Sequence, residues 1–371
     1  MRILFTGPAS AGHLFPMVPT AQALRAAGHE VLFACGQPLD QLRGAGFPIV
    51  ELGDGRVLRD LFEDRLQGKI EYVAAGKSQE EIFDRAALLF AHASRLSVDG
   101  LLETATGWGA DLIVHDSFEA AAPLVATLLK IPSVVNNFGV KPGLPMAGLL
   151  ASHFTDVYER HGLDGPAAAI ALNVGPLGGD PDGLPMRYVP YNGGGVVPTE
   201  FLRPADRPRI VVTLGTVLAE LDGVRAVVRL VEAAAEVDAD FLLAVGGADL
   251  TPLGTLPDNV RGLPWVPLNE LLGRADVLIH HGGSGTMLTA LQAGLPQLLL
   301  PQGADHFINA EALTATGAAL SSASDAVDTA LLDRLVTDPG LRDAAHRLRA
   351  ENAALPSPAA LVPALEALTT A

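Results

Sequence analysis

The stretch from Val277 to Thr286 reads VLIHHGGSGT and decides how the rest of the chain is interpreted. Its apolar start, VLI, is too short for a helix and is typical of a strand buried on both faces. Glycines follow, and helical spacing resumes shortly after Thr286. Such a turn presents unpaired N–H groups at the positive end of a helix dipole, so the stretch predicts a phosphate cradle. The alternative is an ordinary strand-to-helix turn with two structural histidines.

The first twenty residues repeat this design. Residues 2–6 (RILFT) predict a strand, residues 7–12 a loop of small residues, and Pro16 the start of a helix. His13 should then lie at the carboxyl end of the first strand, where open α/β sheets bind ligands. An exposed histidine near a helix start is the alternative. A secretory signal is disfavoured, because glycines and prolines interrupt any apolar run of the required length.

Composition limits the classes of protein that remain. The chain has 371 residues, 49% of them hydrophobic, and no apolar run approaches the roughly 18 residues of a membrane span. Its single cysteine, Cys35, excludes internal disulfides and predicts a reducing, cytoplasmic location. A net charge of −17 argues against nucleic acid as a partner. An anionic ligand must therefore be bound locally, by backbone dipoles and a few histidines.

Strand and helix patterns alternate in two halves, which predicts an α/β protein with two parallel sheets. The segment 56–108 is helical in pattern and contains no strand candidate. The expected strands are Arg2–Thr6, Glu30–Ala34, Pro48–Leu52, Leu112–His115, Ser133–Asn136, Ile210–Leu214, Phe241–Val245, Val277–His280 and Gln297–Leu300.

Glycines and prolines concentrate between Gly175 and Pro208, which predicts the linker between the halves. We expect an N-terminal domain over residues 1–200, including most of this linker, and a C-terminal domain over residues 209–355. Residues 356–371 read as a short apolar helix that needs a partner surface, although chain ends often fray.

Two groups of motifs resemble one known family. The chain is similar to the two-domain, nucleotide-sugar-dependent glycosyltransferases of the GT-B fold, in particular the bacterial enzymes that attach deoxysugars to secondary metabolites such as antibiotics. The resemblance covers essentially the whole chain and implies two Rossmann-like domains facing each other across a cleft, with acceptor in the first and donor in the second. The motifs are Gly12–Pro16, Trp265–Pro267, Leu271–Leu272, His280–Thr286, Ala293–Pro296 and Pro301–His306.

The resemblance also implies roles for single residues. Trp265 corresponds to the residue that stacks on the nucleobase, although a core tryptophan is the alternative. Asp305 corresponds to the acid that hydrogen-bonds the sugar hydroxyls, although it could simply cap a helix. His281 and the amides of the cradle correspond to the diphosphate site. The complete donor-binding set implied is Gly12, Thr216, Trp265, Val266, His281, Gly282, Gly283, Ser284, Gly285, Thr286, Asp305 and His306.

Two departures from the family pattern bear on the donor. Thr289 stands where enzymes that use uridine diphosphate carry a ribose-binding glutamate, so a deoxyribose and hence a dTDP-sugar are favoured. A carboxylate left unpaired beside a missing hydroxyl would cost roughly 1–3 kcal/mol. His306 stands where plant members carry glutamine, which favours a modified hexose or a pentose over glucose.

His13 and Asp116 are the candidate catalytic pair. Asp116 follows the apolar run 112–115 and should lie at a carboxyl strand end near His13. A carboxylate on one ring nitrogen would stabilise the imidazolium as the other takes the acceptor's proton, which implies an inverting transfer. The cradle and His281 would stabilise the leaving diphosphate without a metal. Asp116 could instead cap the helix expected near Phe118.

Other interpretations remain open at this point. Asp238/Asp240 and Asp180/Asp182 match the two-carboxylate pattern of metal-dependent transferases, but both are expected to be solvated turns. A sugar-nucleotide epimerase or hydrolase on the same fold, or a non-catalytic auxiliary partner of a transferase, are the competing functions. The expected partners are a nucleotide sugar and a small-molecule aglycone, with no cofactor and no metal. A homodimer is left open.

Overall fold

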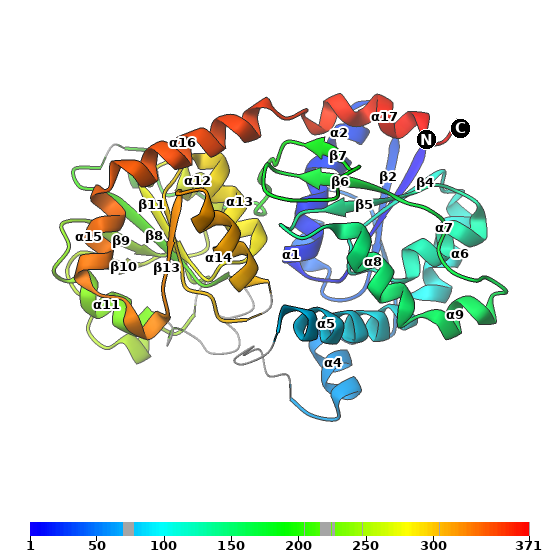
Figure 1. Cartoon of the computed structure of the whole chain (residues 1–371), viewed down its shortest axis with the longest axis horizontal. Helices are drawn as coiled ribbons and strands as arrows, with labels where there is room; N and C mark the ends of the chain where they lie inside the picture. Colours follow the sequence, from blue (N-terminus) through cyan, green and yellow to red (C-terminus); the bar gives the residue numbers. More distant parts are fainter. Residues whose placement is uncertain are drawn as a thin grey trace. The chain divides into compact units, whose positions relative to one another are not determined.

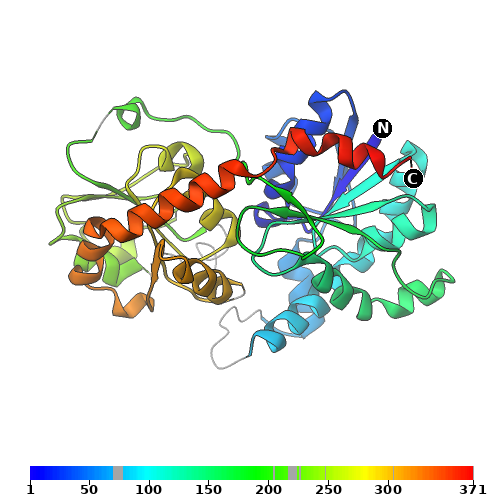
Figure 2. The same ribbon diagram turned by 45° about the horizontal axis from the view of Figure 1, so that its top comes forward.

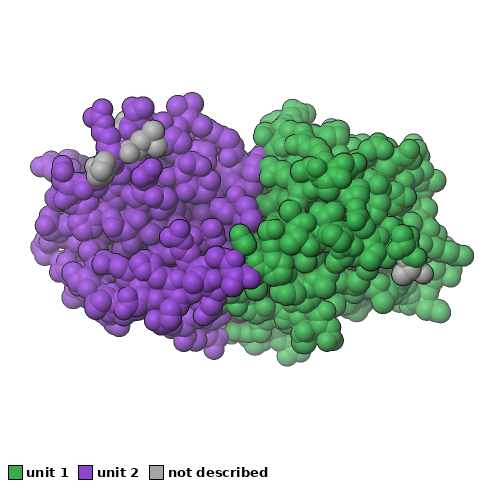
Figure 3. All heavy atoms as spheres, turned by 90° about the horizontal axis from the view of Figure 1, so that it is seen from above, with its two compact units in different colours: residues 1–187, 355–371 green, residues 188–354 purple. Residues whose placement is uncertain are grey.

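A computed structural model describes residues 1–69, 78–203, 205–215, 224, 227–246, 248–303 and 305–370. The chain forms two compact units, coloured separately in Figure 3. Unit 1 contains Met1–Arg187 and Leu355–Ala371, and unit 2 contains Tyr188–Ala354. Each unit is a parallel β-sheet with helices on both faces (Figures 1 and 2), so the expected α/β class with two Rossmann-like sheets is confirmed.

Unit 1 is built on a sheet of seven described strands in the order β3-β2-β1-β4-β5-β6-β7, with parallel pairing throughout. The order reverses direction between β1 and β4, which makes this pair the topological switch point of the sheet. The strands are β1 (Arg2–Thr6), β2 (Glu30–Cys35), β3 (Ile49–Glu51), β4 (Leu112–His115), β5 (Ser133–Asn137), β6 (Ile170–Val174) and β7 (Leu184–Met186).

Helices cover the two faces of this sheet, as Figure 1 shows for α2 and α17 on one side and α6 and α7 on the other. The described α-helices of unit 1 are α1 (Ala11–Leu14), α2 (Val18–Ala26), α3 (Asp40–Arg43), α4 (Leu58–Leu66), α5 (Gln79–Ser94), α6 (Val98–Trp108), α7 (Ala121–Leu129), α8 (Gly143–Ser152), α9 (Thr155–Arg160) and α17 (Val362–Ala367).

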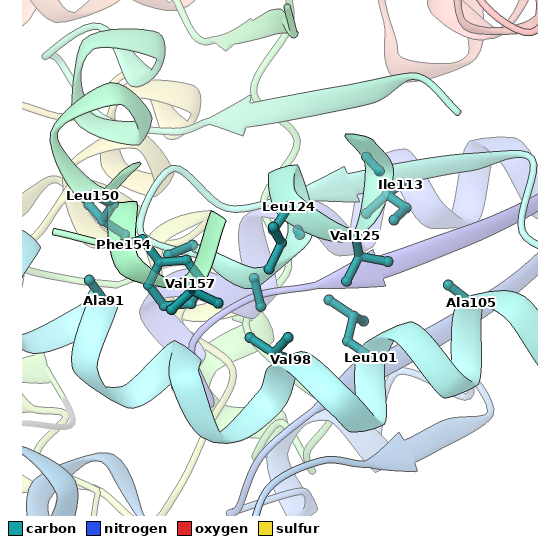
Figure 4. Close-up of a cluster of buried hydrophobic side chains, with 14 of the residues drawn as sticks. Ala91, Val98, Leu101, Ala105, Ile113, Leu124, Val125, Leu150, Phe154 and Val157 are labelled. Atoms are coloured by element: carbon teal, nitrogen blue, oxygen red, sulfur yellow. The ribbon is translucent and has the colours of Figure 1, made fainter. Parts of the chain in front are cut away.

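The core of unit 1 lies between the sheet and the helices that follow β3 and β4. Ile113 of β4 packs with Leu101 of α6 and Val125 of α7, and Phe154 closes the cluster beside α5 (Figure 4). These side chains are almost fully buried. Burying one such side chain contributes about 1.5–3 kcal/mol, so the cluster fixes the position of β4 and of the residues that follow it.

Unit 2 repeats the arrangement with a sheet of six described strands in the order β10-β9-β8-β11-β12-β13. Its switch point lies between β8 and β11. The strands are β8 (Arg209–Thr213), β9 (Asp240–Leu243), β10 (Val260–Gly262), β11 (Val277–His280), β12 (Gln297–Leu299) and β13 (Ala319–Ser321). The described α-helices are α11 (Val228–Ala234), α12 (Leu268–Leu272), α13 (Ser284–Ala293), α14 (His306–Ala315), α15 (Thr329–Thr337) and α16 (Pro339–Ala354).

All nine expected strands are present, with ends within two residues of the prediction. Four further strands, β6, β7, β10 and β13, were not expected. Strand β7 lies inside the predicted linker and contains Pro185, which an edge strand tolerates because one side of its backbone needs no partner. The segment 175–208 is therefore partly a strand of unit 1, and the units divide between Arg187 and Tyr188.

The last residues of the chain belong to unit 1. A short 3₁₀ turn (Pro358–Leu361) packs against α2 and leads into α17, whose Leu365 is fully buried. His29 Nε2 lies 3.0 Å from Glu366 Oε1, close enough for an ion pair when the ring is protonated. The terminal helix thus supplies apolar and polar contacts to the edge of unit 1 where the chain begins (Figure 2).

Replacing Leu365 with alanine should lower the unfolding free energy of unit 1 by about 2–5 kcal/mol, because it empties a fully buried site. The chain has two tryptophans, and Trp108 is the one in unit 1. Urea unfolding followed by Trp108 fluorescence in a Trp265→Phe background measures the change. Ala367→Ser, at an exposed position on the same helix, is the control. Equal midpoints for the two variants would show that the terminal helix does not stabilise unit 1.

Candidate active site

The cradle of unit 2 begins where β11 ends at His280. Gly282 has a φ of +102°, and a Cβ built on it would lie 3.1 Å from the Cβ of His306, so only glycine fits the turn. Gly283 then precedes the first turn of α13. The first N–H groups of that helix, on Ser284, Gly285 and Thr286, have no intrahelical acceptor and lie at the positive end of its dipole. Such a group of N–H donors can bind an anion through the backbone alone, so the phosphate cradle stays a prediction.

The His281 ring fits at this site because two glycines beside it leave the space that it occupies. A Cβ on Gly215 would lie 2.6 Å from the ring, and one on Gly283 would overlap it. A hydrogen bond to the Thr213 backbone and the edge of the His306 ring, 4.8 Å away between centroids, complete the enclosure. Burial, with the neighbouring histidines, holds the pKa of His281 well below its usual range. The ring is therefore neutral at pH 7 and acts as a hydrogen-bonding group rather than a cation.

His280, the first histidine of the pair, is structural. Its Nδ1 accepts a hydrogen bond from Gly282 N–H at 3.1 Å, and its Nε2 donates to Gln297 Oε1 at 2.9 Å. Burial lowers the pKa of His280 to about 3, so it stays neutral. His280 therefore fixes the loop, whereas His281 lies beside the predicted anion site.

Asp305 is tied to the cradle instead of capping a helix. It precedes α14 but makes no capping hydrogen bond. Its Oδ2 accepts from Ser284 Oγ at 2.8 Å and from Asn309 Nδ2 at 2.7 Å. Asn309 also donates to the Gly282 carbonyl at 2.8 Å. Asn309 was missed from the sequence, and its one signal was the spacing of four residues from Asp305 on a helix.

Three further residues of the expected donor site differ in how far they are exposed to solvent. Trp265 is 51% exposed, so the core alternative is wrong, and its indole Nε1 donates to the Gly194 carbonyl at 3.3 Å. Val266 and His306 are buried, and the His306 ring packs edge-on against the His281 ring. Trp265 follows β10, three strands from β11, which places it about 14 Å along the same sheet edge.

The dTDP argument from Thr289 is not supported by its position. Thr289 is 1% exposed, and its hydroxyl donates to the Gly285 carbonyl at 2.7 Å. Tyr188 covers it, with 2.9 Å between the two hydroxyl oxygens. Both partners are satisfied within the protein, so Thr289 does not present its hydroxyl to a ligand. Thr216, the other expected phosphate contact, lies outside the described residues.

In unit 1 the structure brings His13 and Asp116 together. Thr6 of β1 pairs with His115 of β4, so the residues that follow both strands meet at the switch point. His13 Nδ1 lies 3.0 Å from Asp116 Oδ1, and Asp116 is fully buried. With the N–H on Nδ1 donated to the carboxylate, Nε2 becomes the basic nitrogen of the ring. Gly12 lies beside His13 in α1.

Asp116 does not cap a helix, so that alternative is wrong: α7 starts only at Ala121, with Ala120 as its N-cap residue. Asp116 instead orders the turn after β4. Its Oδ1 accepts from the backbone N–H of Phe118 at 2.8 Å, and its own N–H donates to the Thr6 carbonyl at 3.2 Å. Asp116 therefore fixes this turn and holds His13 at the same time.

Three phenylalanines surround the His13 ring and were missed from the sequence. The rings of Phe90, Phe118 and Phe138 meet it edge-on, with centroid distances of 5.2, 5.4 and 5.7 Å. They come from α5 and from the loops after β4 and β5. An apolar ligand with a hydroxyl group fits such surroundings, because the rings provide contact area and exclude water around the base.

Among the described residues, neither carboxylate pair belongs to a cluster of three or more His, Cys, Asp or Glu side chains that could hold a metal ion. Asp238 and Asp240 are exposed to solvent and form ion pairs with Arg207. For Asp180 the expected solvated turn is wrong. It is 5% exposed, and its carboxylate accepts from the N–H groups of Gly143 and Leu144 at the start of α8, at 2.8 and 3.0 Å.

Two Rossmann-like sheets, one carrying a histidine–carboxylate pair and the other a glycine-rich helix start and an exposed tryptophan at the same sheet edge, have the architecture of the GT-B glycosyltransferases. Comparison with known proteins agrees. Profiles described as "Erythromycin biosynthesis protein CIII-like" match an N-terminal domain over residues 22–215 and a C-terminal domain over residues 228–368. The chain belongs to this family of deoxysugar-transferring glycosyltransferases of secondary metabolism.

Individual relatives match over almost their full length. Elloramycin glycosyltransferase ElmGT of Streptomyces olivaceus is 35% identical over 97% of this chain and 95% of its own. The crystal structure of the glycosyltransferase SnogD from Streptomyces nogalater is 39% identical, with a TM-score of 0.86 over 100% of this chain and 99% of that one. The spinosyn rhamnosyltransferase SpnG, solved with thymidine diphosphate, is 31% identical, with a TM-score of 0.84 over 99% and 100%. No described helix is long and apolar enough to cross a membrane.

The free protein should lose stability as the pH falls below about 6.5, the ordinary pKa of histidine. Burial lowers the pKa of His280, His281 and His306, so below pH 6.5 the unfolded chain binds protons that the native state does not. Each such group adds up to about 1.4 kcal/mol of lost stability per pH unit. Urea unfolding between pH 7.5 and 5 checks the slope, and His281→Gln should make it shallower. An unchanged slope in the variant would contradict the assignment.

Proposed function

We propose that the protein transfers a deoxysugar from a dTDP-sugar to a hydroxyl group of a natural-product aglycone, with inversion at the anomeric carbon. The observation that carries this is the contact between His13 and the buried carboxylate of Asp116, surrounded by aromatic rings. SpnG, which shares the fold at about 30% identity, has been solved with thymidine diphosphate and with the spinosyn aglycone. The same two kinds of ligand are proposed for this chain.

The donor belongs to unit 2 in this proposal. The N–H groups of Gly283, Ser284, Gly285 and Thr286 and the neutral His281 ring bind the diphosphate, and the exposed face of Trp265 stacks on the base. Asp305, with one oxygen engaged by Ser284 and Asn309, holds its other oxygen for a sugar hydroxyl. The proposed preference for dTDP rests on the relatives and no longer on Thr289.

The acceptor belongs to unit 1, where His13 acts as the general base. Nε2 takes the proton of the acceptor hydroxyl. The hydroxyl oxygen then attacks the anomeric carbon of the donor from the face opposite the diphosphate. Asp116 fixes the tautomer and stabilises the imidazolium that forms, at a distance of 3.0 Å. Positioned acid–base catalysis of this kind contributes about 10²–10⁴-fold to the rate.

The leaving dTDP gains charge as the glycosidic bond of the donor breaks. The helix-end N–H groups of α13 are already oriented toward this charge and need no reorganisation, which is the efficient form of electrostatic stabilisation. We infer that they and His281 perform the task that a divalent ion performs in metal-dependent transferases. Asp238 and Asp240 both form ion pairs with Arg207, which would compete with a metal ion for them.

His13→Ala should lower kcat by roughly 10²–10⁴-fold and leave dTDP affinity unchanged, because His13 lies in unit 1 and the cradle in unit 2. The kcat for an aliphatic alcohol should fall more than the kcat for a phenol, because a phenol ionises more easily. His153, which pairs with Asp84 at 3.1 Å on the surface of unit 1, gives the matched control His153→Ala. Full turnover of an aliphatic acceptor by His13→Ala, or equal losses in both variants, would reject the proposed base.

Turnover should survive treatment with a chelator, and added magnesium should not increase it. The physical reason is that backbone N–H groups and a neutral histidine stabilise the departing diphosphate. Steady-state rates before and after EDTA treatment measure this. Loss of activity on chelation with recovery on adding magnesium or manganese would contradict metal independence without affecting the proposed base.

A further inference from the structure

The first residues of unit 2 contact the candidate donor residues at two places. We call residues 188–195 the strap; it begins directly after Arg187, where unit 1 ends. The Tyr188 hydroxyl meets the first turn of α13, and six residues later the Gly194 carbonyl meets the indole of Trp265. The strap therefore touches both the predicted phosphate cradle and the residue proposed to stack on the base.

A buried asparagine of α16 fixes the start of the strap. Asn352 is fully buried, and its Oδ1 accepts from the Tyr188 N–H at 2.9 Å while its Nδ2 donates to the Tyr188 carbonyl at 3.1 Å. The same Nδ2 donates to Gln292 Oε1 of α13 at 2.5 Å. Because both backbone groups of Tyr188 are bound by one side chain, the tyrosine leaves the strap at a fixed point.

The Tyr188 hydroxyl forms a hydrogen-bonded group with the first turn of α13. Its oxygen lies 2.9 Å from the Thr289 hydroxyl and 3.1 Å from the Gly285 carbonyl, and Thr289 donates to the same carbonyl at 2.7 Å. Tyr188 is buried, and burial raises the pKa of its hydroxyl to about 12, so it keeps its proton. Both hydroxyl hydrogens therefore serve the Gly285 carbonyl, directly or through the other hydroxyl.

This carbonyl belongs to the same planar peptide group as the N–H of Thr286. That N–H is one of the donors of the predicted cradle, and its direction is fixed when the carbonyl at the other end of the plane is fixed. Hydrogen bonds to the carbonyl also polarise the peptide group, which strengthens its N–H as a donor. Tyr188 and Thr289 thus act on the far side of the group that would contact a diphosphate.

The other end of the strap packs against the loop that carries Trp265. The Gly194 carbonyl accepts from the indole Nε1 at 3.3 Å. A Cβ on Gly195 would lie 2.7 Å from Cδ of Pro267 and 3.4 Å from Cδ1 of Trp265, so a side chain there would push the strap away. Because the N–H lies at the edge of the ring, this bond fixes the indole and leaves its face for stacking.

We propose that the strap positions both parts of the donor site: Tyr188, through Thr289, orients the Thr286 N–H toward the diphosphate, and Gly194 orients the indole of Trp265 toward the base. The inference rests on the proposed function, which takes unit 2 as the donor unit. It assigns Thr289 a positioning role in place of the ribose contact expected from the sequence. Binding of the diphosphate and of the base should then be weakened separately by changes at the two ends of the strap.

Tyr188→Phe tests the first end, because it removes the hydroxyl and keeps the ring. Its affinity for dTDP should fall roughly threefold to tenfold, the effect of one hydrogen bond, and its affinity for inorganic pyrophosphate should fall by a similar factor. Thr289→Val should weaken both ligands as well, whereas Thr289→Ser keeps the hydroxyl and should retain the wild-type affinities. Calorimetric titration of the full chain with dTDP, and displacement of dTDP by pyrophosphate, measure these values.

Tyr158→Phe is the matched control. Tyr158 is buried in unit 1, and its hydroxyl has no hydrogen-bond partner among the described residues. The control should bind dTDP and pyrophosphate as the wild type does. If Tyr188→Phe does not fold, the difference between Thr289→Val and Thr289→Ser decides the same point.

Gly195→Ala tests the second end. In a Trp108→Phe background Trp265 is the single tryptophan of the chain, and its fluorescence reports on the strap. Gly195→Ala should shift the emission to longer wavelength, because the displaced strap exposes the indole to water. It should weaken dTDP and leave pyrophosphate affinity unchanged. Tyr188→Phe should show the opposite pattern, with unchanged emission and weakened pyrophosphate, which a general loosening of unit 2 would not produce.

The outcomes separate the strap from the proposed function. Equal dTDP affinities in Tyr188→Phe and Tyr158→Phe would overturn the role of Tyr188, and unchanged emission in Gly195→Ala would overturn that of Gly194. Equal loss of dTDP and pyrophosphate affinity in Gly195→Ala would overturn the division between the two ends. A wild-type protein that binds neither dTDP nor pyrophosphate would instead reject the donor site of the proposed function, and the role of the strap with it.

Discussion

The parallel pairing of two central strands at the switch point of each sheet is the constraint on which both sites depend. In unit 1 the register of β1 with β4 fixes where the chain leaves each strand, and His13 and Asp116 approach from 103 residues apart. In unit 2 the pairing of β8 with β11 sets Gly215 against His281 in the same way. A shift of one residue in either pair would turn every side chain to the opposite face of the sheet and separate the partners.

The candidate sites of the two units differ in their electrostatics, in a chain with a net charge of −17. In the proposed function unit 2 accepts an anion without cationic side chains, through N–H groups and a histidine that burial keeps neutral. Unit 1 has to keep a carboxylate buried beside a ring that becomes positive. Glu119, one turn further on, is buried without a cation and is neutral below pH 7.

Much of the fold could be predicted because the decisive strands are apolar runs that end in glycine or in a polar residue. Val277–His280 and Leu112–His115 were predicted to the residue, since burial on both faces leaves no other interpretation for runs so short. Strands such as Leu184–Met186 could not be predicted, because three residues containing a proline form a strand only when a neighbouring edge accepts them.

The site was partly predictable for a related reason. Residues that follow buried strands, such as His13, Asp116 and His281, can be identified from their position in the sequence. Contacts between distant segments cannot be identified in this way. Examples are the cover of Tyr188 over Thr289, the anchoring of α8 by Asp180 and the phenylalanines around His13. A sequence motif identifies which residue type stands at a strand end, but burial decides whether its side chain reaches a ligand.

The position of the terminal helix in unit 1 has a consequence for synthesis on the ribosome. Unit 2 is a continuous segment, whereas unit 1 needs both its first 187 residues and the residues after Ala354. During translation unit 2 is complete while α2 still lacks the apolar cover that residues 358–367 provide. Folding from the N-terminus onward thus leaves unit 1 unfinished until residues 358–367 have left the ribosome, and α2 exposes apolar surface until then.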